Sequence, residues 1–67
     1  MPLVEISVVA GRPPEKIRDL IHQVHAAVRN SLGAPDGAIR VLVREIPPEH
    51  WVAGDVTKAE QEASHER

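Results

Sequence analysis

The residue with the most unusual chemical potential is Pro2, which directly follows Met1. Removal of Met1 in front of a small residue would leave a secondary amine at the start of the chain. The pKa of an α-amino group is ordinarily about 7.7–8.0, and burial or neighbouring cations lower it toward the working range of a general base. Pro2 is therefore a candidate base or nucleophile, although many chains begin with Met-Pro without catalytic consequence.

Two arginines could bind an anion. Arg12 follows the first apolar segment of the chain, and Arg40 lies within the second. The guanidinium group presents a fork of donors that matches a carboxylate bidentately. Each arginine could instead form an ion pair at a subunit interface, with a partner from Glu5, Glu45 or Glu49. Both interpretations remain open from the residues alone.

The histidines do not indicate a metal site. His22 and His25 lie three residues apart on the polar side of the expected helix, whereas zinc ligands on a helix are typically four apart, and no third ligand is evident. His50 stands beside Trp51 and could act on a substrate, but a loop histidine is more often a solvated surface group. Because glycine-rich phosphate motifs and Ser or Cys nucleophile signatures are also absent from the sequence, we expect neither metal nor organic cofactor.

Three segments must position these groups. Residues 3–10 are rich in β-branched types with alternating faces, which predicts a strand. From Pro14 to Leu32 apolar residues recur at spacings of three and four, which predicts a helix with one apolar stripe, and Gly33 is placed to cap it. Residues 38–46 predict a second strand. This order predicts a β-α-β unit with parallel strands and a right-handed crossover.

The rest of the chain is short and polar. Pro47-Pro48 ends the second strand, and residues 50–55 predict a short loop or hairpin in which Trp51 must pack against something. Residues 57–67 contain no large apolar side chain, which predicts a frayed helix or a disordered tail. We therefore divide the chain into a domain of residues 2–56 and a polar tail of residues 57–67.

The chain is too small to bury a sizeable core by itself. It has 67 residues, 42% of them hydrophobic, no Cys, and Trp51 as its single aromatic residue. A monomer of this size buries only about 60% of its unfolded surface. One helix covers one face of a two-stranded sheet, so the other face keeps Leu3, Val9, Leu42 and Ile46. The expected fold is thus an α/β unit completed by oligomerisation.

Charge and hydropathy argue against two classes of partner. Eight Lys and Arg stand against ten Asp and Glu, a net charge of −2, so the basic excess needed for phosphate backbones is missing. No apolar run approaches the roughly 18 residues of a membrane span, and the first residues lack signal-peptide features. We expect a cytoplasmic protein that binds neither nucleic acid nor membranes.

Taken together, these features resemble the 4-oxalocrotonate tautomerases, small enzymes with an amino-terminal proline catalyst. The resemblance is collinear over residues 2–56. It rests on these residues: Pro2 opening the strand, Gly11-Arg12 closing it, Glu15 beginning the helix, Ser31-Leu32-Gly33-Ala34-Pro35 ending it, then Ile39-Arg40-Val41, Glu45 and His50-Trp51. One departure is Val52-Ala53-Gly54-Asp55, where members of that family usually carry a Gly-Ile-Gly-Gly hairpin.

The resemblance implies a function and a site. Pro2 would be the general base that moves a proton within an enol or dienol form of a 2-oxo acid, such as 2-hydroxymuconate, without a cofactor. Arg12 would bind a substrate carboxylate, Arg40 of a neighbouring subunit would hold the 2-oxo and carboxylate end, and Trp51 would supply an apolar wall. The resemblance also implies a homohexamer built as a trimer of dimers, with a role in aromatic catabolism.

Two alternatives to this function remain. The chain could be a promiscuous phenylpyruvate-type tautomerase that acts on monocarboxylates. It could also be a non-catalytic oligomeric module that retains the fold. Retention of Met1 would favour the module, because an acylated proline nitrogen cannot serve as a base.

Overall fold

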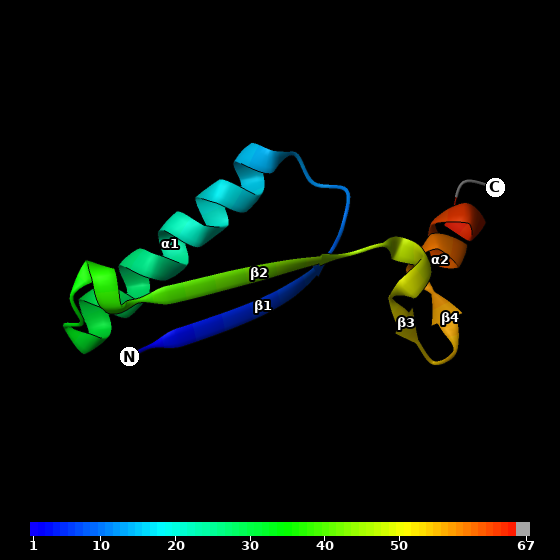
Figure 1. The fold of residues 1–67 in the computed structure, drawn as a ribbon. Coiled ribbons are helices and arrows are strands. Elements are labelled where there is room, and N and C mark those ends of the chain that lie inside the picture. The colour runs from blue at the N-terminus through cyan, green and yellow to red at the C-terminus, as the bar shows by residue number, and fades with distance from the viewer. Residues whose placement is uncertain (66–67) are drawn as a thin grey trace.

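The computed structural model of the chain describes residues 1–65 and has the predicted β-α-β unit at its centre (Figure 1). A long helix lies across one face of a two-stranded sheet, and a small hairpin and a second helix follow beyond the end of that sheet. The elements in chain order are β1 (Leu3–Val9), α1 (Pro14–Leu32), the 3-10 turn η1 (Asp36–Ala38), β2 (Arg40–Ile46), the 3-10 turn η2 (Pro48–His50), β3 (Val52–Ala53), β4 (Val56–Thr57) and α2 (Lys58–His65). The predicted α/β fold is confirmed.

The two long strands are parallel and begin and end together. Leu3 lies opposite Arg40, and Val9 lies opposite Ile46. The ladder reaches one residue further back, because the backbone N–H of Arg40 donates to the carbonyl of Pro2 at 3.0 Å. The hydrogen-bonded ladder between the two strands therefore includes Pro2.

The helix α1 begins and ends where its sequence predicts. Pro13 stands at the N-cap position and makes no side-chain capping bond, and Pro14 occupies the first helical position, where its missing N–H costs nothing. Gly33 ends the helix in the left-handed region, with a φ of 68°, and its N–H donates to the carbonyl of Arg29 at 2.9 Å. β2 starts at Arg40 rather than at residue 38, because Asp36–Ala38 closes a 3-10 turn first.

The C-terminal segment is more ordered than a tail. β3 and β4 form an antiparallel hairpin across Gly54 and Asp55, whose φ values of 62° and 63° suit a tight two-residue turn. Thr57 and Glu60 then cap α2 reciprocally: the Thr57 hydroxyl accepts from the Glu60 N–H at 3.0 Å, and the Glu60 carboxylate accepts from the Thr57 N–H at 2.8 Å. Of the two expected alternatives the helix forms over Lys58–His65, while residues 66–67 lie outside the described residues.

The single chain buries very little. Within residues 1–65, Ile39 is the one buried hydrophobic side chain, with 7% of its surface exposed. Leu3 and Leu42, on the sheet face away from α1, are 56% and 49% exposed. The radius of gyration is 15.5 Å, whereas a compact chain of this length would have about 11 Å. Apolar surface is thus available for contact with other copies.

A polar contact fastens η1 to the end of α1. Asp36 Oδ1 lies 2.9 Å from His25 Nε2 and 3.6 Å from Arg29 Nη1. The hydrogen bond from His25, and then the charge of Arg29, hold the pKa of the Asp36 carboxyl below its usual 3.8. This contact fixes the turn that leads directly into Ile39 and β2.

The lowered pKa gives a pH-dependent stability difference between the wild type and Asp36→Asn. A carboxyl whose folded pKa lies below its unfolded value stabilises the fold above the unfolded value and loses that contribution as the pH falls through the folded one. We expect Asp36→Asn to be less stable than the wild type at neutral pH and equally stable well below pH 3.8. Thermal unfolding of both proteins across that range measures the gap; a gap that stays constant with pH would contradict the assignment.

Candidate active site

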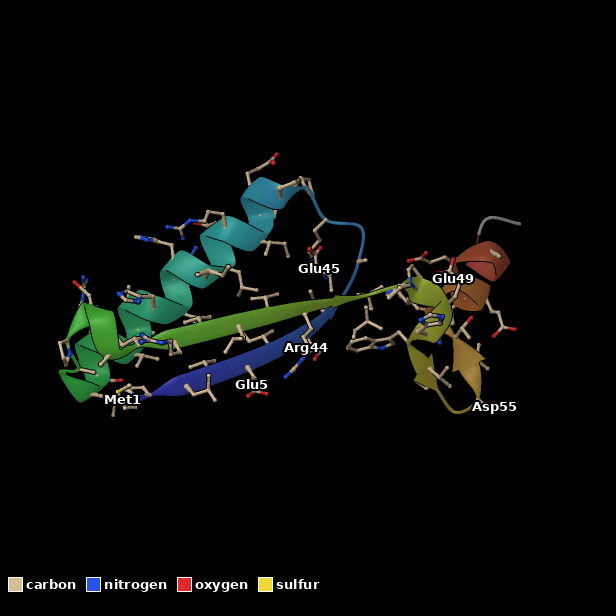
Figure 2. All side chains as sticks on the ribbon, viewed as in Figure 1. Met1, Glu5, Arg44, Glu45, Glu49 and Asp55 are labelled. Carbon is tan, nitrogen blue, oxygen red and sulfur yellow. The ribbon has the colours of Figure 1, made fainter. Side chains whose placement is uncertain are left out.

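Pro2 stands half-buried at the start of β1. Its carbonyl accepts the Arg40 N–H of the same chain at 3.0 Å, so the first strand pair brings Pro2 and the backbone of Arg40 together. Figure 2 places Met1 at one end of the sheet and Glu45 at the other. The base candidate therefore lies at the end where both strands begin.

The guanidinium group of Arg40 contacts backbone carbonyls of the preceding residues and no described carboxylate. Its Nη1 donates to the carbonyl of Gly37 at 2.6 Å and lies 3.5 Å from the carbonyl of Ile39. Glu5, one of the expected ion-pair partners, instead accepts from Arg44 Nη2 at 2.8 Å (Figure 2). Among residues 1–65, Arg40 thus keeps most of its donors available for an anion.

Arg12 and Trp51 lie at the opposite end of the sheet. Arg12 follows β1, is exposed, and donates from Nη1 to the carbonyl of Val9 at 3.0 Å, with no salt bridge to any described residue. Trp51 follows η2 beyond the end of β2 and is 37% exposed, while its carbonyl accepts the Lys58 N–H at 2.8 Å. Both side chains can therefore meet a ligand or a neighbouring copy.

One copy of the chain cannot assemble all the predicted site residues. The structure pairs Pro2 with Arg40 and leaves Arg12 and Trp51 beyond the far end of the strands. A strand rises about 3.3 Å per residue, so the seven residues of β1 separate the two groups by roughly 20 Å. Only a second copy of the chain could place an Arg12 beside Pro2.

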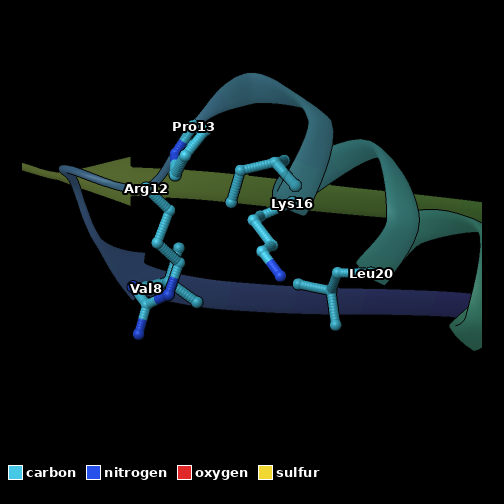
Figure 3. Close-up of a pocket in the computed structure, with 6 residues that line it drawn as sticks. Val8, Arg12, Pro13, Lys16 and Leu20 are labelled. Atoms are coloured by element: carbon cyan, nitrogen blue, oxygen red, sulfur yellow. The ribbon is translucent and has the colours of Figure 1, made fainter.

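A cavity of about 510 Å³ opens beside Arg12, between β1 and the beginning of α1 (Figure 3). Such a volume is within the range of small-molecule sites. Its lining is apolar apart from two cations, and consists of Val8, Arg12, Pro13, Lys16, Ile17 and Leu20. Lys16 was not among the residues predicted from the sequence. The spacing of apolar residues places Lys16 on the polar side of the helix, and only the packing of α1 on β1 reveals that it borders the cavity.

Arg12 also borders a second hollow, which faces α2. This space of about 360 Å³ is lined by Val9, Ala10, Gly11, Arg12, Lys58 and Glu62. It is more polar than the first and includes the carboxylate of Glu62. The two hollows therefore offer Arg12 different electrostatic surroundings on its two sides.

His25 bonds to Asp36, as described above. Among the side chains of residues 1–63, no three His, Asp or Glu lie together as possible ligands for an ion. His50 ends η2 and is exposed. Within residues 1–65, neither helix has the length and apolarity needed to cross a membrane.

Comparison with known proteins gives matches over nearly the whole chain. The family model described as tautomerase enzyme matches residues 2–61. A probable tautomerase of Staphylococcus epidermidis is 34% identical over 61 residues, which cover 91% of this chain and 100% of the relative. A probable tautomerase of Lactiplantibacillus plantarum is 36% identical over 63 residues, which cover 94% of this chain and 98% of the relative.

Solved structures agree with these sequence matches. TomN, a 4-oxalocrotonate tautomerase homologue in the tomaymycin biosynthetic pathway, superposes with a TM-score of 0.89 at 39% identity, covering 96% of this chain and 98% of its own. A heterohexamer 4-oxalocrotonate tautomerase from Chloroflexus aurantiacus gives a TM-score of 0.82 at 32% identity, covering 90% and 97%. Fold and sequence similarity therefore extend together along the chain.

Proposed function

This chain belongs to the tautomerase family, and we propose that it converts an enol or dienol form of a 2-oxo acid, such as 2-hydroxymuconate, into its keto tautomer. The observation that carries the proposal is the match of the tautomerase family model, which spans residues 2–61 and thus begins at the candidate base. The substrate class is supported by the likeness to homologues of 4-oxalocrotonate tautomerase. The reaction needs a base, an anion receptor and an apolar pocket, and the chain offers candidates for each.

Pro2 is the proposed base. After loss of Met1, its neutral secondary amine takes the proton from the enol oxygen, and the O–H electron pair becomes part of a carbonyl group. The carbon-carbon double bonds shift, and the amine returns the proton to a carbon of the substrate. Nearby guanidinium groups favour the neutral amine and stabilise the negative charge that develops on the oxygen.

Arg12 and Arg40 are the proposed anion receptors. Neither forms an ion pair with a carboxylate among residues 1–65, so binding a substrate carboxylate breaks no described salt bridge. Arg12 would hold the carboxylate distant from the reacting enol. The backbone of Arg40 pairs with Pro2 of the same copy, but its guanidinium group donates to the carbonyl of Gly37. The Arg40 that binds the 2-oxo and carboxylate end would come from a neighbouring copy, and Trp51 would exclude water as an apolar wall.

The proposed site requires self-association. Pro2 and Arg12 lie at opposite ends of β1, and the sheet face that carries Leu3 and Leu42 is exposed in one copy. A second copy that lies across this face in the opposite direction brings its Arg12 to Pro2 and covers the apolar surface at the same time. We propose a homohexamer, formed as a trimer of dimers, as the functional assembly.

The first test concerns the identity of the base. We expect intact-mass measurement to find a chain that starts at Pro2, and kcat/KM for 2-hydroxymuconate to fall as the pH drops through an amine pKa below the ordinary 7.7–8.0. Pro2→Ala keeps a primary amine and should retain part of the activity. An N-terminal extension that acylates the proline nitrogen should abolish it. Full turnover by a protein proven to keep Met1 would refute the assignment and favour a non-catalytic module or another base.

The second test separates the roles of the two arginines. Arg12→Ala should raise KM for the diacid 2-hydroxymuconate and have little effect on a monoacid such as phenylenolpyruvate. Arg40→Ala should lower kcat for both, because it acts on charge that grows in the transition state. A hydrogen bond to a charged group predicts losses of about 10- to 150-fold.

Stability and mass must be measured beside these kinetics. If the arginines serve instead as interface ion pairs, both variants lose oligomer mass in light scattering, or thermal stability, together with activity. Equal losses on both substrates from fully assembled variants would contradict the division of roles. A wild type that prefers the monoacid would favour the phenylpyruvate-type alternative.

The third test asks whether one pocket takes residues from two copies. A variant with a blocked Pro2 should be inactive toward the diacid, and the variant Arg12→Ala should keep at most about a tenth of the wild-type activity toward it. After joint unfolding and reassembly in equal amounts, pockets that combine an intact Pro2 of one copy with an intact Arg12 of another should regain about a quarter of the wild-type activity. No recovery from mixed oligomers of normal mass would show that both residues act from the same copy.

A further inference from the structure

We propose that Lys16 sets the preference of the pocket for dianionic substrates, by acting with Arg12 as a receptor for the second carboxylate. The inference rests on the proposed function and extends it to a residue for which the family resemblance implies no role. The proposed ligand of this receptor is the carboxylate end of a small diacid. A monoacid with an apolar end would gain nothing from the second cation.

The two cations border the same cavity from different elements. Arg12 comes from the loop after β1 and lies beside Val8, whereas Lys16 comes from the first turn of α1 and points toward β1 near Leu20 (Figure 3). Every other lining residue is apolar, and no acidic side chain is among them. A ligand in this cavity therefore meets two positive charges against a wall of low polarity.

The structure leaves these charges uncompensated within residues 1–65. Neither Arg12 nor Lys16 takes part in a salt bridge among the described residues. Glu15 stands in the first turn of α1, but it does not line the cavity. Two like charges beside one space repel each other, and an anion placed between them relieves that repulsion.

The positive potential of the cavity comes from Arg12 and Lys16 and not from the start of α1. Glu15 lies in the first turn of α1, where its charge offsets the positive end of the helix dipole. The hollow on the other side of Arg12 also has a second cation, Lys58, but Glu62 borders it and offsets one of the two positive charges. That side is therefore less positive than the side that Arg12 shares with Lys16. The substrate carboxylate should therefore occupy the side of Arg12 that Lys16 shares.

The experiment compares Lys16→Met with Arg18→Met. Both variants remove one positive charge from α1, but Arg18 is an exposed residue that lines neither hollow. We expect Lys16→Met to lower the ratio of kcat/KM for 2-hydroxymuconate to that for phenylenolpyruvate by about 5- to 10-fold, mainly through KM for the diacid. Arg18→Met should leave this ratio as in the wild type, and Lys16→Arg should restore most of it.

A binding measurement keeps the inference testable without turnover. Isothermal titration with adipate, an unreactive six-carbon diacid, and with hexanoate, its monoacid counterpart, gives the same comparison at equilibrium. Weaker binding of adipate to Lys16→Met than to Arg18→Met supports the receptor even if neither substrate turns over, an outcome that would overturn only the proposed function. Identical ratios and identical adipate affinities for the two variants would overturn the role of Lys16.

Discussion

The central constraint on this molecule is that a two-stranded sheet has two faces and one helix covers only one of them. Val4, Ile6 and Val8 of β1 turn toward α1, whereas Leu3 and Leu42 remain on the open face. Burial of apolar surface is the main force in folding, and the isolated unit has little of it. Its stability is therefore tied to what covers the open face, and the proposed assembly supplies that cover.

The parallel arrangement of the strands decides where chemistry can occur. Both strands start at one end of the sheet, which brings Pro2 beside the backbone of Arg40, and both finish near Arg12. Pro2 and Arg12 flank β1 and lie at its opposite ends whatever the direction of β2. An antiparallel β2 would have placed Arg40 beside Arg12 and away from the base, whereas the crossover helix returns the chain to the end where Pro2 lies. The same helix builds the cavity at the finishing end, where its first turn carries Lys16 over β1.

Local signals in the sequence were sufficient for most of the fold. The three- and four-residue spacing of apolar side chains and the position of Gly33 fixed the bounds of α1, because helix periodicity and left-handed capping are local properties. The helix α2 was predicted less well, although Thr57-Lys58-Ala59-Glu60 carries a capping-box pattern that was visible in the sequence. The residues Ala34-Pro35-Asp36-Gly37 predict a turn, and a 3-10 turn forms at Asp36–Ala38. The contact of Asp36 with His25, eleven residues away, has no local signature.

The sequence named the candidate residues Pro2, Arg12, Arg40 and Trp51, but it did not indicate how their side chains are arranged. Which end of the sheet each residue occupies follows from strand direction. The guanidinium groups of Arg12 and Arg40 each donate one hydrogen bond to a backbone carbonyl, of Val9 and of Gly37. The spacing of residues in the sequence does not predict these bonds, and they decide which donors stay available. Lys16 borders the cavity because of how α1 packs on β1. The sequence could not predict this, because the apolar spacing places Lys16 only on the polar side of the helix.

The distance between the two ends of β1 also has a consequence for kinetics. If each pocket takes its base from one copy and its anion receptor from another, a folded single chain has no complete pocket and no catalytic activity. Activity per chain then depends on the total protein concentration by mass action, and it falls on dilution once the copies separate. A higher synthesis rate of the protein would then raise the total activity in two ways: it increases the number of chains, and it increases the fraction of chains that are assembled.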